Sequence, residues 1–113
     1  MKKTHKKIDN TLRESLTRVC DIALVKIEGF KWLTHMVDYD DFPRSLKVIC
    51  VFDSHQNQTV AQDQHKHDFM CDLINQALLK ENIKLPNIKG QVSFDSEERC
   101  DSQHGGNWAR RLG

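Results

Sequence analysis

The sequence lacks an excess of charge of either sign and lacks any long apolar run. Its 113 residues carry 17 basic and 16 acidic side chains, a formal net charge of +1. Without a dominant charge, bulk electrostatics favour neither nucleic acid, a membrane surface nor an acidic partner, so any such binding would have to be local. The longest apolar runs are far too short to span a bilayer. We therefore predict one soluble domain over residues 1–113, able to bury one modest core.

The cysteines lack the spacing of a zinc site or a disulfide framework. They stand at positions 20, 50, 71 and 100, no two form a C-x-x-C pair, and three fall in apolar periodic stretches. This pattern is typical of reduced, buried thiols in a cytosolic protein. The N-terminus begins with lysines as a signal peptide does, but residues 4–10 are polar and no apolar segment follows. We therefore expect a cytoplasmic protein that does not enter a membrane.

One apolar stretch, residues 46–53, predicts the middle strand of a small sheet. Apolar side chains fall on both of its faces, as expected for a strand with neighbours on either side. Residues 30–39 are rich in aromatic and β-branched side chains and predict a second strand. The turn between them, residues 40–44, is short, so these two strands should form an antiparallel hairpin.

Apolar side chains recur at intervals of three and four over residues 6–28 and 59–80, which predicts two amphipathic helices. Residues 54–58 are expected to form a loop. A short strand at residues 91–95 follows the second helix, so it should pair parallel to residues 46–53 through a right-handed crossover.

A last helix should begin at residue 96 or 97 and end before Gly105-Gly106. The expected order of elements is α-β-β-α-β-α. This order predicts an α/β fold, an α+β two-layer sandwich in which helices cover a small three-stranded mixed sheet.

Carboxylates gather where two of the predicted strands end. Asp53 and Asp95 would close parallel strands at the same edge of the sheet, the edge where open α/β sheets bind ligands. Glu97 and Glu98 follow, so the four side chains could bind Mg²⁺ or Mn²⁺ through oxygen ligands. The structural alternative is that Asp95 or Ser96 caps the last helix, with the acids favoured there by the helix dipole.

Catalytic motifs are otherwise sparse. Cys100 and His104 stand four apart and would share a helical face, which permits a nucleophile and a base, but no third orienting group accompanies them. The two glycines at 105 and 106 are not followed by the Lys-Ser or Lys-Thr of a phosphate loop. We assign no catalytic residue and no cofactor, and Mg²⁺ or Mn²⁺ enters only with the carboxylate site.

Two further groups of residues could bind partners. Trp108 follows the glycine turn and is an anchor for a protein partner if it is exposed, with Arg110 and Arg111 beside it. Local positive charge at the two ends of the chain could instead bind nucleic acid or another anion. The N-terminal part of this charge consists of Lys2, Lys3, Lys6 and Lys7.

Six short segments together give the chain a resemblance to a known group. They are Ile8-Asp9-Asn10 with Leu12, residues 29–35, Phe42-Pro43, residues 51–53, residues 93–98 and residues 106–109. On these segments, which are spread over nearly the whole chain, it resembles a family of short γ-proteobacterial proteins of unknown function, often labelled Fis-family transcriptional regulators. That label implies a C-terminal DNA-binding helix-turn-helix. Only seven residues follow Gly106 here, too few for a recognition helix of normal length, and the resemblance implies no established activity.

Three functions follow from these patterns. The first is a small cytoplasmic interaction or accessory module without catalytic activity, which binds a protein partner or a second copy of itself. The second is a metal-dependent hydrolase-like enzyme built on the strand-end carboxylates. The third is a nucleic-acid-binding regulator that uses the N-terminal lysines and the arginine pair at 110 and 111.

Overall fold

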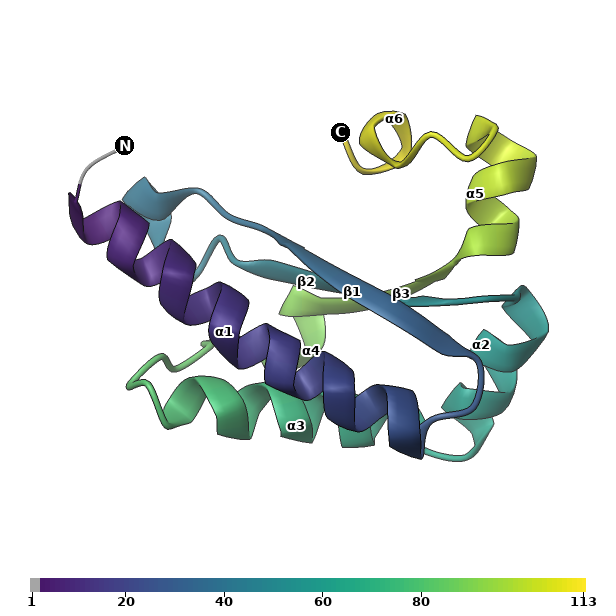
Figure 1. Cartoon of the computed structure of the whole chain (residues 1–113), viewed down its shortest axis with the longest axis horizontal. Coiled ribbons are helices and arrows are strands. Elements are labelled where there is room, and N and C mark those ends of the chain that lie inside the picture. The colour runs from purple at the N-terminus through teal and green to yellow at the C-terminus, as the bar shows by residue number, and fades with distance from the viewer. Residues whose placement is uncertain (1–2) are drawn as a thin grey trace.

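Three strands form one mixed sheet in the order β1-β2-β3, with β2 in the middle (Figure 1). The structure is a computed structural model and describes residues 3–113. The strands are β1 (Phe30–Met36), β2 (Lys47–Phe52) and β3 (Val92–Ser96). β1 pairs antiparallel with β2, and β3 pairs parallel with it. The predicted hairpin, the central position of β2 and the parallel crossover are therefore confirmed.

Helices lie on both sides of this sheet. They are α1 (Lys3–Lys26), α2 (His55–Asp63), α3 (Lys66–Leu79), α4 (Ile88–Gln91), α5 (Glu97–His104) and α6 (Trp108–Leu112), with a short 3-10 helix, η1 (Tyr39–Asp41). In Figure 1, α1, α3 and α4 lie below the sheet and α5 and α6 above it. Within residues 3–113, no helix combines the length and the apolarity needed to cross a bilayer.

The sheet face toward α1 and α3 carries the hydrophobic core, and we call it the core face. Alternate residues of β2, starting at Val48, point to it and are fully buried. α1 and α3 contribute stripes of apolar residues three and four apart, as the periodicity predicts. Burying each such side chain stabilises the fold by about 1.5–3 kcal/mol. The fully buried residues of this core include Leu12, Val48, Cys50, Phe52, Met70, Ile74 and Leu78.

The region between β2 and the second predicted helix differs from expectation. Residues 54–58 are not a loop, because α2 begins at His55, where the Ser54 side chain accepts a hydrogen bond from the Asn57 amide at 3.1 Å. The predicted helix over 59–80 is two helices, separated by His65 in the left-handed conformation (φ 60°). The segment before Phe69 is mostly polar and has no continuous apolar face, so one straight helix there would bury little surface.

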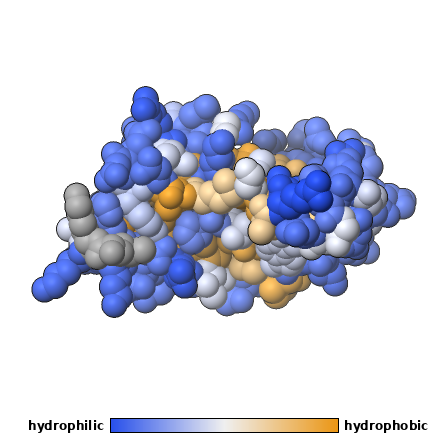
Figure 2. Space-filling model, turned by 90° about the horizontal axis from the view of Figure 1, so that it is seen from above, coloured by the Kyte–Doolittle hydropathy of each residue, from blue (hydrophilic) through white to orange (hydrophobic). Residues whose placement is uncertain are grey.

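The opposite face of the sheet, toward α5 and α6, is only partly covered, and we call it the outer face. The register places Trp32 opposite Val51 and Thr34 opposite Ile49, and alternation puts these side chains on the outer face together with Met36. Figure 2 looks down on this side of the molecule and shows apolar residues across its middle, with hydrophilic residues around them. Met36 remains 39% exposed.

Candidate functional site

Asp53 and Asp95 lie at the same edge of the sheet, because β2 and β3 run parallel and place Asp95 beside Val51. The Asp53 carboxylate is held by α2, the helix that follows it: its Oδ1 accepts a hydrogen bond from Asn57 Nδ2 at 2.8 Å. This bond is the main reason why the pKa of Asp53 is below its usual value. The backbone at this edge is also tied together, since the Glu98 amide donates to the Asp53 carbonyl at 3.2 Å.

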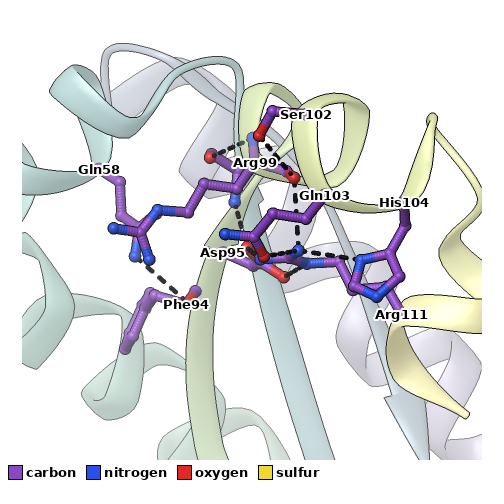
Figure 3. Close-up of polar contacts among 9 residues, drawn as sticks. Gln58, Phe94, Asp95, Arg99, Ser102, Gln103, His104 and Arg111 are labelled. Atoms are coloured by element: carbon purple, nitrogen blue, oxygen red, sulfur yellow. Dashed lines mark hydrogen bonds and ion pairs between the residues drawn. The ribbon is translucent and has the colours of Figure 1, made fainter.

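The Asp95 carboxylate is bound by Arg111 in a two-pronged ion pair. Arg111 Nε lies 2.6 Å from one oxygen and Nη2 lies 2.8 Å from the other (Figure 3). A third donor of the same guanidinium, Nη1, reaches Gln103 Oε1 at 2.7 Å. Burial raises the pKa of Asp95, but the hydrogen bonds and charge of Arg111 outweigh it and hold the pKa below its usual value. This pair joins α6 to the outer face of the sheet.

The two glutamates do not converge with the aspartates. Glu98 Oε1 accepts a hydrogen bond from the His55 amide at 3.0 Å, at the first turn of α2. α5 is capped by Ser96, whose hydroxyl accepts from the Arg99 amide at 3.2 Å, and Glu97 lies in its first turn. Within residues 3–113 no three His, Cys, Asp or Glu side chains are grouped so that they could hold a metal ion. Ser96 caps the last helix and Glu97 and Glu98 lie in its first turn, as the structural alternative predicts, whereas Asp95 is bound by Arg111 instead of capping the helix.

Cys100 and His104 share α5 but are not arranged as a nucleophile and base. The Cys100 side chain is fully buried, and burial raises the pKa of its thiol. The His104 ring lies beside Arg111, with Nδ1 3.3 Å from Nη1 (Figure 3). Gly105 and Gly106 both adopt positive φ angles, 59° and 80°, and so form the left-handed turn that the two glycines predict.

The glycine turn brings Trp108 back onto the sheet. Its ring meets Trp32 edge to face, with 4.8 Å between the ring centroids and 82° between the planes. Trp108 is half-buried, Arg110 is exposed, and Arg111 is held by Asp95. Beside the tryptophan pair runs a groove of about 370 Å³, which we call the aromatic groove. It is lined by Trp32, Thr34, Met36, Trp108, Ala109, Leu112 and Gly113.

A second, larger groove of about 590 Å³ separates α1 from β1. At one end of it Tyr39 donates its hydroxyl to Asp9 Oδ1 at 2.5 Å, and Arg13 Nε lies 2.9 Å from Asp9 Oδ2. His35 Nε2 is 3.7 Å from the same carboxylate. The Tyr39 hydrogen bond is the main cause that lowers the pKa of Asp9, whereas burial, together with Asp9, raises the pKa of Tyr39 to about 12.

Sequence reasoning did not identify this cluster. Asp9 and Tyr39 are 30 positions apart, on α1 and η1, and no local pattern relates two such positions. The available signal was modest: Asp9 directly follows Ile8, the first residue of the apolar stripe of α1, and Tyr39 is the single tyrosine of the chain. An acid placed beside a buried stripe indicates that a hydrogen-bonding partner is close by.

The basic residues of the N-terminus lie apart from both grooves. Lys3, Lys6 and Lys7 are exposed on the first turns of α1, and Lys2 lies outside the described residues. None of the three is among the side chains that line either groove. The exposure of these lysines does not test whether they bind nucleic acid, so that function stays a prediction from the sequence.

Comparison with known proteins does not place the chain in a family. No family model, no curated protein and no solved structure matches it.

Proposed function

We propose that this protein is a small cytoplasmic interaction module without catalytic activity, and that the aromatic groove is its binding surface. The observation that carries the proposal is the incomplete cover of the outer face. α5 and α6 leave an apolar groove open beside the tryptophan pair, with Met36 at its rim. Tryptophan and methionine are enriched at the centres of protein interfaces, because they bury a large contact area.

The charged side chains around this groove support binding rather than chemistry. Arg111 and Asp95 are used to hold α6 in place, so they fix one wall of the groove. Arg110 is exposed on α6 next to this wall and supplies the polar rim expected around an apolar centre. The free thiols at positions 20, 50, 71 and 100 support a reducing compartment such as the cytoplasm.

A site-specific crosslinking experiment tests the proposal. A photoreactive amino acid is placed at Met36 in the groove, and at Val60 on α2 as a matched control. The two side chains are almost equally exposed, 39% and 41%. Irradiation in a cell extract should give a discrete adduct from position 36, and excess unlabelled protein should compete it away. Equal adducts from both positions, or none from position 36, would contradict the proposal.

A further inference from the structure

The groove between α1 and β1 is separate from the aromatic groove, and the proposed function makes no use of it. β1 follows α1 after a short connection and runs back alongside it (Figure 1). Alternation along β1 directs Leu33 and His35 toward this groove, and Trp32 and Met36 toward the aromatic groove. Its volume of about 590 Å³ falls within the range of small-molecule sites, about 300–1,000 Å³, so it has room for a small ligand.

One end of this groove presents hydrogen-bond donors. Both oxygens of Asp9 already have partners there: Oδ1 accepts from the Tyr39 hydroxyl at 2.5 Å, and Oδ2 lies 2.9 Å from Arg13 Nε. Burial and the bond to Asp9 raise the pKa of Tyr39 to about 12, so the phenol keeps the donated proton at neutral pH. The Asp9 contact uses only Nε of Arg13, whose side chain is 71% exposed, so the two terminal nitrogens of Arg13 remain available. A carboxylate is a group that such a guanidinium edge binds well.

The other end of the groove is acidic. Asp21 lines it and follows Arg13 by two helical turns, which is about 12 Å along α1 at about 1.5 Å per residue. None of the ion pairs found among residues 3–113 includes Asp21. Its carboxylate therefore favours a cation on a bound molecule and disfavours a second anion. The two ends of the groove thus select groups of opposite charge.

The floor between these two ends is apolar. Leu16 is only 2% exposed, and Cys20 and Leu33 are partly buried against the hydrophobic core. The Thr17 hydroxyl, which also lines the groove, donates to the Arg13 carbonyl at 2.7 Å and so already has a partner. An alkyl chain laid over this floor would be removed from water, which favours its binding.

We infer that this groove binds a linear aliphatic zwitterion, a molecule with a carboxylate at one end of an alkyl chain and an amino group at the other. The carboxylate pairs with Arg13, the chain covers Leu16 and Leu33, and the amino group pairs with Asp21. A dicarboxylate would set an anion against Asp21, and a diamine would set a cation against Arg13. This site goes beyond the proposed function, because it lies outside the aromatic groove and involves no protein partner.

Four compounds that share an eight-carbon chain test the inference: ω-aminooctanoate, octanoate, octylammonium and octanedioate. Each is titrated at millimolar concentrations while the amide NMR spectrum of the protein is followed. We expect ω-aminooctanoate to shift amides along the groove and to bind about threefold to fivefold tighter than octanoate or octylammonium, because each of these makes only one ion pair. Octanedioate should bind more weakly than octanoate, because its second carboxylate meets Asp21.

Charge reversal at the acidic end tests the assigned orientation. In Asp21→Lys, octanedioate should bind tighter than ω-aminooctanoate, which reverses the wild-type order. Arg13→Gln should weaken octanoate about threefold and leave octylammonium unchanged. Arg18→Gln is the matched control, since Arg18 lies on the same helix, is 61% exposed and does not line the groove. It should leave the affinities of all four compounds unchanged.

Several results would overturn the inference. They are the absence of groove shifts with ω-aminooctanoate, equal affinities for the four compounds, and an unchanged order in Asp21→Lys. Equal affinities would mean that the chain adsorbs without any recognition of its ends. Circular dichroism checks that the variants fold. Asp21→Lys alone keeps the test decisive if Arg13→Gln disturbs the Asp9 pair, because Asp21 has no contact with that pair.

Discussion

The two faces of the sheet use similar side chains for different purposes. On the core face, Met70 is fully buried among the apolar stripes of two long helices. On the outer face, Met36 is 39% exposed beside a short helix that is held by an ion pair. A long amphipathic helix buries many contacts at once, whereas a five-residue helix depends on single interactions. We therefore expect the core face to supply most of the stability of the fold, whereas the outer face leaves a groove open.

The largest expected effect comes from truncating the same residue type on the two faces. Met70→Ala should lower the free energy of unfolding by about 3 kcal/mol, because it leaves a cavity in a close-packed core. Met36→Ala should lower it by only about 0.5 kcal/mol, because that side chain is already partly solvated. Urea unfolding followed by circular dichroism gives both values. Similar losses from the two substitutions would show that the faces do not differ as described.

The next effect concerns the ion pair that holds α6. Arg111→Met should cost about 2 kcal/mol of stability, because it removes hydrogen bonds between charged groups that are mostly buried. Both tryptophans of the chain lie at this groove, so fluorescence reports on it directly. Their emission should shift to longer wavelength when α6 detaches. Arg110→Met, one residue away and exposed, is the control, and a red shift of equal size in that variant would count against the ion pair.

A smaller, pH-dependent effect follows from Asp95. Its folded-state pKa lies below the ordinary value of 3.8, so the ionised group stabilises the fold above that value. This contribution is lost as the pH falls through the lowered pKa. Unfolding free energies measured from about pH 6 down to about pH 2 should show the loss in the wild type and a weaker pH dependence in Asp95→Asn. Identical pH profiles for the two proteins would exclude this role of Asp95.

The smallest expected effect concerns α2, which packs beside β3 and contributes Ala61 to the core. Ser54→Ala should lower stability by about 1 kcal/mol, because the first turn of α2 loses its side-chain cap. Ser102→Ala, an exposed position within α5, should have almost no effect. Thermal unfolding of the two variants gives the comparison. If Ser54→Ala is as harmless as Ser102→Ala, the Ser54 cap contributes little.

The sheet could be predicted from the sequence because its signals are local. The apolar run of β2 marks a buried strand, and the lengths of the two connections determine which neighbour is antiparallel and which is parallel. The break at His65 had no such signal, because neither glycine nor proline stands there. It places His67 flat against Phe94 of β3, at 3.6 Å between ring centroids, a contact that a helix pattern does not reveal.

The candidate site was harder to predict because its contacts are tertiary. The direction of the two strands correctly predicted that Asp53 and Asp95 lie at the same edge of the sheet. It did not predict which residues bind their carboxylates. Arg111 reaches Asp95 only because the glycine turn folds α6 back over the sheet, and Asp9 meets Tyr39 across 30 positions of the chain. Trp108 was predicted in part. The sequence predicted the glycine turn that precedes it, but not that its ring would pack against Trp32.

Native-state hydrogen exchange tests the difference between the two faces most directly. Amides of α5 and α6 should exchange through an opening of the outer face that requires less free energy than the opening of β2 and α3. The exchange of α6 should also accelerate in Arg111→Met while that of β2 changes little. Equal opening free energies in α6 and β2, with the same denaturant dependence, would contradict the account, because the outer face would then be as firmly held as the core.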